Sequence, residues 1–304
     1  MKKIILILLI AATGCSIHAQ KPGISRYNQV NTEGNKAAFF PVLNRTGDLL
    51  LYSSGVYSGL QLHELATQKN ITISTEAGAG YEPIFDLTNN RIFYRYSTFE
   101  NGRKFDGMQS YELKTGKTVP MLSPRRELRQ MRGYNNGFLV AAEKQLLKVT
   151  FGRTDNDDLY FVTTEDLKMV LVKEGRKHYL NPLQMDESRY IWVSLSPDNN
   201  RILFTAAGKG TFICDLQGKI LHRLNYLNAP VWYDANYVVG MNDKDDGHVV
   251  TASTIELVNI KTNERTPVSR KGEIAMHPTA AGQAGKIAYH TTEGKIFVAE
   301  VVFK

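Results

Sequence analysis

Residues Ser194 to Leu224 read SLSPDNNRILFTAAGKGTFICDLQGKILHRL, and this stretch decides the fold. Its opening box, Ser196-Pro197-Asp198-Asn199-Asn200, predicts a tight turn, because proline presets φ and the Asp and Asn side chains bond to nearby backbone. Three apolar runs follow, at 201–206, 211–216 and 219–224, and two short turns separate them. With residues 191–195 in front, the stretch predicts four short antiparallel strands. Such a sheet cannot bury both faces alone, so it implies neighbours of the same kind.

Less regular copies of this stretch recur along most of the chain. The apolar residue that ends each third strand recurs six times, at Leu65, Leu113, Leu167, Leu216, Ile260 and Val301. These intervals lie close to the roughly 40–50 residues of a propeller blade. The third copy is the least regular, with runs at 128–134 and 138–142, then an insert, then 159–163 and 169–173. The sequence therefore predicts an all-β fold, a six-bladed β-propeller over residues 21–304.

The two ends of the chain are expected to meet in one blade. The sixth copy ends at Lys304 without a fourth strand, which would leave an exposed sheet edge open to pairing with other chains. Residues 24–30 are interpreted as a further strand that belongs to no nearby hairpin. We therefore expect this N-terminal strand to complete the last blade and close the ring.

Residues 1–20 predict a secretory signal. Met1-Lys2-Lys3 is positively charged, and the apolar run from Ile4 to Ala12 is too short for a stable membrane span. Two cleavage sites remain open. Ala12-Thr13-Gly14-Cys15 resembles a bacterial lipoprotein box, which would make Cys15 a lipidated N-terminus, whereas Ile17-His18-Ala19 suits an ordinary signal peptidase. In both cases we expect an exported protein, periplasmic or associated with the outer membrane, that meets a membrane only through lipid on Cys15.

The composition is that of an ordinary globular protein, with 22% charged and 42% hydrophobic residues. The net charge of +7 is scattered, and the one basic cluster, formed by Arg125, Arg126, Arg129 and Arg132, is expected to be a solvated loop. An exported protein without a groove-reading motif is not expected to bind nucleic acid. Cys214 lies within a predicted strand, so we expect a buried free thiol and no disulfide.

The repeat residues carry a family likeness. The box from Ser196 to Ile202, its relatives at Pro83–Phe85 and Pro230–Trp232, and the loop Asp245-Asp246-Gly247-His248 resemble the WD40-like repeats of TolB-type six-bladed propellers. The resemblance covers nearly everything after the signal. It implies the propeller fold but no single activity, since these propellers serve as peptidase domains, sugar lyases and envelope scaffolds. The extra N-terminal α/β domain of TolB has no counterpart in this chain, and neither does the hydrolase domain of the peptidases.

Two acidic loops are candidate binding sites. The first contains Asp243, Asp245, Asp246 and His248, and the second contains Asp155, Asp157 and Asp158. As an EF-hand, the first loop would place Lys244 at a ligand position, which that loop cannot use. A looser cation site remains one interpretation. The other is an elongated hairpin in which Asp and Gly serve the turn geometry.

Residues near the expected inner strands are the remaining candidates. His277 precedes Pro278 in an inner strand, where it would be either a ligand in the central channel or a structural group. Trp192 and Trp232 border inner strands, where they would either pack between blades or form a platform for a sugar ring. A channel holding three or more His, Asp, Glu or Gln side chains would favour the ligand interpretations. A channel lined by Ser, Ala and aliphatic residues would exclude them.

No motif of the sequence predicts catalysis. Gly55-Val56-Tyr57-Ser58-Gly59 has its serine one place too late for a nucleophile elbow, and Gly116-Lys117-Thr118 lacks the first glycine of a phosphate loop. We therefore expect a monomeric, non-catalytic scaffold without a cofactor, which binds another protein of the cell envelope through loops at one end of the ring. The alternative is an enzyme or glycan-binding module that uses the central channel.

Overall fold

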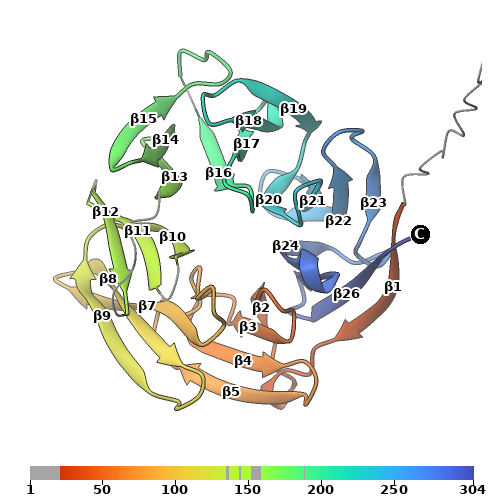
Figure 1. Ribbon diagram of the computed structural model, residues 1–304. Helices are drawn as coiled ribbons and strands as arrows, with labels where there is room; N and C mark the ends of the chain where they lie inside the picture. Colours follow the sequence, from red (N-terminus) through yellow and green to blue (C-terminus); the bar gives the residue numbers. More distant parts are fainter. Residues whose placement is uncertain (1–20, 135–136, 144, 152–158, 188) are drawn as a thin grey trace, which may run out of the picture.

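The structure, a computed structural model, describes residues 21–304 except 135–136, 144, 152–158 and 188. Seven antiparallel sheets stand around a central axis as the blades of a ring (Figure 1). The all-β propeller expected from the sequence is confirmed, but the expected number of six blades is wrong, because the described strands form seven separate sheets. No helix within this described part is long and apolar enough to cross a membrane. The expected signal at 1–20, with Cys15, lies outside the described residues.

Four blades contain four strands each, in the order of the sequence. Blade one contains β2 (Phe39–Leu43), β3 (Leu49–Ser53), β4 (Leu60–Glu64) and β5 (Lys69–Ser74). Blade two contains β6 (Ile84–Phe85), β7 (Arg91–Glu100), β8 (Arg103–Glu112) and β9 (Thr118–Arg125). Blade five contains β16 (Tyr190–Leu195), β17 (Arg201–Ala206), β18 (Gly210–Asp215) and β19 (Ile220–Asn225). Blade six contains β20 (Asn228–Trp232), β21 (Tyr237–Asp245), β22 (Val250–Asn259) and β23 (Arg265–Pro267).

The other three blades depart from this plan. Blade three contains β10 (Leu128–Tyr134), β11 (Gly137–Ala142) and β12 (Gln145–Thr150), and blade four contains β13 (Tyr160–Glu165), β14 (Lys168–Lys173) and β15 (Arg176–Leu180). Blade seven contains β24 (Ala275–Ala281), β25 (Lys286–Thr291), β26 (Ile296–Phe303) and, at its outer edge, β1 (Pro22–Gln29). Two short 3₁₀ helices, η1 (Glu33–Asn35) and η2 (Gly282–Ala284), lie in loops.

The ring closes as the sequence predicts. Strand β1 pairs with β26 in antiparallel register from Pro22 opposite Phe303 to Gln29 opposite Phe297. The backbone N–H of Lys21 donates to the carbonyl of Lys304 over 2.7 Å, and the reverse bond is 3.0 Å long. The first and last described residues are thus hydrogen-bonded to each other, and the outer edge of β26 is covered (Figure 1).

The error in the blade count lies in the third sequence copy. Residues 128–173 were expected to form one sheet with an insert, but β10–β12 and β13–β15 are two sheets that share no strand pairing. Each of the two sheets has only three strands. Together they therefore take up about the same length of chain as one four-stranded blade with a long insert, and the repeat interval does not distinguish the two cases. Leu139 of blade three packs against Phe161 and Val170 of blade four, as residues of neighbouring blades do elsewhere in the ring.

Blade four lacks an innermost first strand among the described residues. Arg132, near the end of β10, donates to the carbonyl of Tyr160 at the start of β13 over 2.8 Å, whereas Arg129, near the start of β10, donates to Thr164 at the other end of β13 over 3.4 Å. Strand β13 therefore runs opposite to the first strand β10, as second strands do. The described inner strands number six, β2, β6, β10, β16, β20 and β24, and these are the strands that the repeats in the sequence mark.

The boxes that follow the first strands are turns closed by their first side chain. The hydroxyl of Ser196 accepts from the backbone N–H of Arg201 over 3.0 Å. Asp86 accepts from the N–H groups of Asn90 and Arg91 in the same way, and Asn44 does so in blade one. All three first residues are buried. These side chains replace backbone partners that the turn removes, which explains why Ser, Asp and Asn recur there.

The core lies between the blades. Strand residues are apolar on both sheet faces, so each blade packs against both neighbours, as in the cluster of Phe204, Phe212 and Met169 between blades four and five. Cys214 belongs to the same cluster and is fully buried, which confirms the expected free thiol. Burial raises the pKa of this thiol to about 12, so it is an unreactive packing group.

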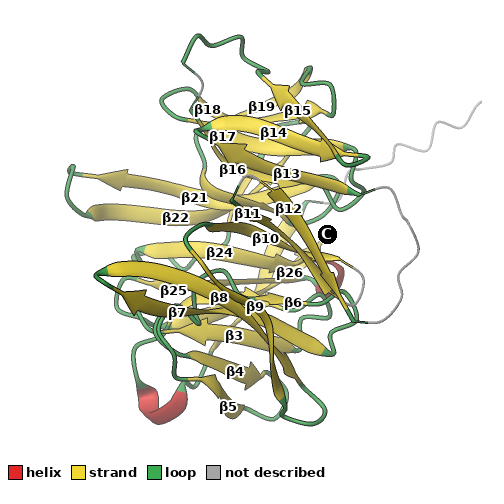
Figure 2. Ribbon diagram, turned by 90° about the vertical axis from the view of Figure 1, so that its left-hand side faces the viewer, coloured by secondary structure: helices red, strands yellow, loops and turns green. Residues whose placement is uncertain are grey.

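The two faces of the ring differ. Successive strands alternate in direction, so the hairpins between second and third strands lie on the same face as the starts of the first strands. We call this the hairpin face. Two of its hairpins, β7–β8 and β21–β22, are long and project on the same side of the molecule (Figure 2).

Candidate binding site at the mouth of the central channel

Five residues at equivalent positions near the start of the inner strands adopt a left-handed backbone. They are Phe40, Glu82, Trp192, Ala229 and His277, with φ values of 54°, 50°, 53°, 45° and 46°. Four of the five precede a proline, and four lie where the inner strand loses register with its neighbour in a β-bulge. A residue before proline is normally extended with negative φ, so each position stores roughly 1–3 kcal/mol of strain. Bulges of this kind redirect side chains.

A cavity of about 510 Å³ opens among blades two to six at this level. Its aromatic lining consists of Tyr81, Trp192 and Trp232. Its polar lining consists of Glu82, Arg129, Gln130, Thr163, Thr164 and Ser194, and apolar residues of β10, β16 and β20 complete it. Glu82 and Arg129 lie at the starts of the inner strands of blades two and three, and Thr164 lies near the end of β13, so the cavity opens at the hairpin-face end of the central channel. From there it reaches along β16 and β20 to Ser194 and Trp232. We refer to it as the channel mouth.

Among the described residues, blade four contributes no first strand between the inner strands of blades three and five. Across the gap, the inner strands of blades three and five bond directly to each other. The Gln130 amide donates to the carbonyl of Val193 over 2.8 Å, and the guanidinium of Arg132 donates to the side chain of Asn199. The channel mouth therefore reaches outward to Thr163 and Thr164 of the second strand β13.

Glu82 is the one carboxylate among the lining residues. Its carboxylate lies 3.5 Å from the guanidinium of Arg95, while 47% of the Glu82 side chain still meets solvent. Desolvation raises the pKa of Glu82, and the charge of Arg95 opposes this effect. Arg95 is only 1% exposed and also donates to the carbonyls of Leu128 and Arg129, over 2.7 and 3.0 Å. It fixes Glu82 and the start of β10 from behind the cavity.

The two tryptophans of the chain both line the channel mouth but are held differently. Trp232 donates its indole N–H to the carbonyl of Ser194 over 3.4 Å, and the guanidinium of Arg201 lies 5.4 Å from its ring centre. Trp192 is 44% exposed although it lies in an innermost strand. The structure thus places Trp232 between blades five and six and leaves the Trp192 indole facing open space.

A row of rings continues the channel mouth toward blades one and seven. Tyr81 meets Tyr57 edge-on at 5.1 Å between ring centres, and Tyr57 stacks on Phe40 at 4.1 Å. Phe40 then contacts His277 and His290, which stack on each other at 5.4 Å. Burial lowers the pKa of both histidines, to about 4 for His290. His277 therefore lies in an aromatic contact between blades seven and one, apart from the residues that line the cavity.

The acidic loop of blade six is organised by its own backbone. Asp246 accepts from the N–H groups of His248 and Val249, both over 2.9 Å, and Asp245 accepts from Gly247 over 2.8 Å. These bonds hold down the pKa of Asp246. Asp243 instead accepts from the hydroxyl of Tyr226 over 3.0 Å. Within the described residues, no three His, Cys, Asp or Glu side chains converge on a metal-sized site. The second acidic loop, with Asp155, Asp157 and Asp158, lies outside those residues.

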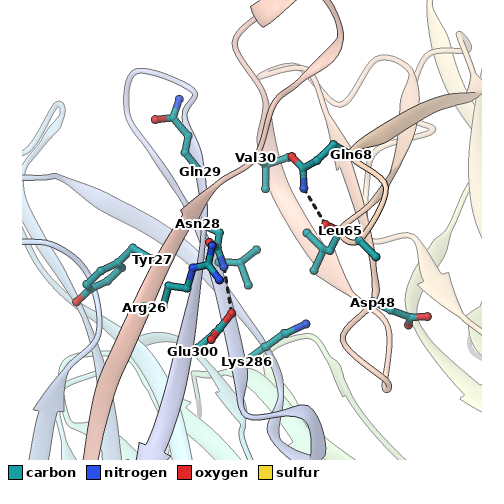
Figure 3. Close-up of a pocket in the computed structure, with 12 residues that line it drawn as sticks. Arg26, Tyr27, Asn28, Gln29, Val30, Asp48, Leu65, Gln68, Lys286 and Glu300 are labelled. Atoms are coloured by element: carbon teal, nitrogen blue, oxygen red, sulfur yellow. Dashed lines mark hydrogen bonds between the residues drawn. The ribbon is translucent and has the colours of Figure 1, made fainter.

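A second cavity of about 540 Å³ lies at the seam between blades seven and one (Figure 3). Asn28 of β1 donates to Glu300 over 3.1 Å on one side, and the amide of Gln68 donates to the carbonyl of Leu65 over 2.7 Å on the other. Lys286 donates to the carbonyl of Gly47 over 2.7 Å. The Asn28–Glu300 bond joins the side chains of β1 and β26, and the Lys286–Gly47 bond joins blade seven to blade one. We therefore assign this cavity to the seam between these blades and place the candidate site in the channel mouth.

Sequence reasoning singled out Trp192 and Trp232 but missed Glu82, Arg129 and Gln130. A signal for Glu82 was present, because Glu82-Pro83 aligns with Phe40-Pro41, Ala229-Pro230 and His277-Pro278 at the start of the inner strands. Arg129 and Gln130 carried no such signal, since they meet Thr164 and Val193 only through the closure of the ring. Of the His, Asp, Glu and Gln side chains that would favour a ligand in the channel, the lining contains two, Glu82 and Gln130. Three or more were set as the criterion, and aromatic rings accompany these two.

Comparisons with known proteins support the fold. No protein-family model matches the sequence, and no curated protein matches it. The structure is similar to the β-propeller domain of Cps50 (Swd1) from Myceliophteria thermophila, with a TM-score of 0.58 and 12% identity over 91% of this chain and 100% of that one. It is also similar to oligogalacturonate lyase from Vibrio parahaemolyticus (TM-score 0.51, 13% identity, 88% of this chain and 79% of that one).

TolB from Acinetobacter baumannii is a further structural neighbour, with a TM-score of 0.52 and 13% identity over 81% of this chain and 57% of that one. The likeness to TolB-type propellers that the repeats suggest is therefore present at the level of the fold. These identities are low, and the neighbours include both a lyase and TolB, so the comparisons show a β-propeller and no particular activity.

Proposed function

We propose that this protein is a non-catalytic scaffold that binds a protein partner on its hairpin face. The observation that supports this proposal is the position of the most exposed apolar side chains. Val56, Phe99 and Val249 are 79%, 66% and 61% exposed, and each lies at or beside the tip of a hairpin between second and third strands. Leu167, Tyr226, Trp192 and Tyr81 add exposed apolar surface to the same face.

An apolar side chain at a hairpin tip does not stabilise the core, because the strand residues that pack between blades lie several positions away along the chain. These side chains lie on the loops of one face, and rigid scaffolds present recognition residues on such loops. The two long hairpins project beyond the other loops (Figure 2), so they would meet a partner first. Hot-spot side chains in interfaces are typically aromatic, which makes Phe99 the central contact of this proposal.

The charges of the two long hairpins differ. Hairpin β21–β22 carries Asp243, Asp245 and Asp246 against Lys244, an excess of negative charge. In hairpin β7–β8 the charges balance, because Glu100 and Asp106 accompany Arg103 and Lys104, and Lys104 lies 3.1 Å from Asp106. A partner that spans the ring would therefore carry a basic patch for blade six. Such pairs at the rim act mainly on the association rate, so we expect association to slow as salt increases.

The test is capture of a partner by crosslinking from cell-envelope fractions. The variant Val56→Ser/Phe99→Ser/Val249→Ser should lose a crosslinked protein that the unchanged chain captures. A matched control, Tyr179→Ser/Leu221→Ser, changes exposed apolar residues on the outer strands β15 and β19 and should retain it. If both variants capture the same proteins as the unchanged chain, the hairpin face is not the binding surface and the proposal is wrong.

Export belongs to the same proposal and rests on residues 1–20. We propose that the mature chain is found in the periplasm or at the outer membrane as a monomer. Mass spectrometry of the N-terminus distinguishes a lipidated chain that begins at Cys15 from an unmodified chain that begins after Ala19. Light scattering of the purified protein measures its oligomeric state. Recovery of the intact N-terminus from the cytoplasmic fraction would contradict export.

A further inference from the structure

We propose that the channel mouth binds a neutral saccharide, with one sugar ring stacked on the indole of Trp192. This inference rests on the lining of the cavity and not on the hairpin tips, and of the residues named for the partner surface it uses only Trp192 and Tyr81. The cavity of about 510 Å³ lies within the usual range for small-ligand sites. It combines aromatic rings with planar polar side chains. The aromatic rings can stack on the apolar C–H face of a sugar ring, and the polar side chains can hydrogen-bond to the hydroxyl groups around its rim.

Trp192 provides the platform. Its strand keeps register with β17 at Ile191 opposite Thr205 and again at Ser194 opposite Leu203, so an extra residue bulges out between these pairs. A bulky residue with φ of 53° is a genuine backbone outlier, and such strain persists where the surrounding structure imposes it, often at ligand sites. The bulge leaves the ring 44% exposed at the cavity instead of packed between blades.

The polar side chains around Trp192 have unused acceptors. The Gln130 amide donates to Val193, and no described residue donates to its own carbonyl oxygen. The carboxylate of Glu82 has Arg95 at 3.5 Å but accepts no hydrogen bond from the described residues. The oxygens of Gln130 and Glu82 can accept hydrogen bonds from the hydroxyl groups of a ligand. The guanidinium of Arg129, whose side chain is 44% exposed, can donate hydrogen bonds to such hydroxyl groups. A sugar supplies hydroxyls of both kinds.

The charges favour a neutral sugar. Glu82 is the one acid and Arg129 the one base among the lining residues. Each already has an opposite charge nearby, Arg95 for Glu82 and Glu127 for Arg129. An acidic sugar would bring a second negative charge beside Glu82, and a cationic ligand would bring a second positive charge beside Arg129. Neither charge would find an unpaired partner in the lining.

The test uses the fluorescence of the protein itself. The chain contains two tryptophans, and both line the cavity, so a stacked sugar must change the emission. Titration with cellohexaose, maltohexaose and xylohexaose should give a saturable change with at least one of them, and trigalacturonate should give none. Trp192→Ala keeps Trp232 as the reporter and should weaken binding roughly fivefold to tenfold. Glu82→Gln removes a charged acceptor and should weaken it roughly tenfold.

Controls separate this inference from the protein partner and from misfolding. Phe99→Ser changes a hairpin tip and should leave the sugar affinity unchanged, even where it abolishes partner capture. Trp192→Phe keeps an aromatic ring and should retain part of the affinity, while circular dichroism confirms that each variant is folded. The proposal is overturned if none of the three neutral sugars saturates the signal, if trigalacturonate binds more tightly than they do, or if neither cavity variant changes the affinity.

Discussion

Arg95 shows how one side chain supports the site from outside it. It is buried, and its guanidinium joins the carboxylate of Glu82 to the carbonyls of Leu128 and Arg129 on the next blade. We expect Arg95→Leu to lower the free energy of unfolding by about 2–4 kcal/mol, because two buried carbonyls would lose their donor. Urea unfolding measures this change. Lys295→Ala removes an exposed ion pair with Glu293 and should leave the urea midpoint unchanged. Equal midpoints for both variants would contradict the role of Arg95.

His290 should make the stability depend on pH. Its Nδ1–H donates to the carbonyl of Thr291, its Nε2 has no hydrogen-bond partner among the residues that the structure describes, and the residue is 4% exposed. Burial lowers its pKa from 6.5 to about 4. The unfolded chain therefore takes up the proton first, so stability is full above pH 6.5 and falls as the pH decreases toward 4, by on the order of 2–3 kcal/mol.

Urea midpoints at pH 7.5 and pH 5 measure this effect. His290→Phe should reduce the difference between the two midpoints, since phenylalanine fits beside Phe39 and Phe40 and does not titrate. The exposed His248→Gln is the control and should keep the difference found in the unchanged chain. A pH difference that survives in His290→Phe would assign the effect to other groups, among them His277.

At the scale of elements, blade four is the feature that the sequence could not reveal. Gln130 and Arg132 connect β10 directly to blade five across the gap in the inner ring. We expect Gln130→Ala/Arg132→Leu to destabilise the protein by about 1–3 kcal/mol and to accelerate amide hydrogen exchange in β10 and β16. Exchange in β2 and β24, on the other side of the ring, should not change. Arg126→Ala, on the exposed side of the same arginine cluster, is the matched control.

Local sequence patterns predicted the strands and turns. The number of blades and the residues that line the site depend on contacts between distant parts of the chain, which these patterns do not record. The box turns and the strands of blades one, two, five and six follow from short apolar runs and from turn residues such as Ser196, whose effect reaches only a few positions along the chain. The blade count failed because strands were assigned to sheets by analogy, and the sequence of β13 reads equally well as a late strand of blade three. Glu82 and Arg129 line the same cavity only because blades two and three pack side by side, so no spacing in the sequence records their proximity.

At the scale of the whole molecule, the closure of the ring depends on β1. A chain that begins at Asn31 lacks this strand and exposes the edge of β26. We expect this truncated chain to form oligomers, because an unpaired edge pairs with other chains. Light scattering measures the oligomers, and a chain that begins at Lys21 is the control and should remain monomeric. A synthetic peptide of residues 21–30 added to the truncated chain should restore the monomer. A truncated chain that is monomeric and equally stable would show that closure does not need β1.

The pairing of Pro22 with Phe303 also determines when the ring can close during the synthesis of the chain. During synthesis, β1 is among the first described segments to leave the ribosome, and its partner β26 is the last. The ring therefore cannot close before β26 has been made, and the earlier blades wait until then with one flank uncovered. For a protein proposed to leave the cytoplasm, this delay is useful, because a propeller that closed early would be too wide to be threaded through a secretion channel. Strand β26 would then complete the fold only after the chain had crossed the membrane.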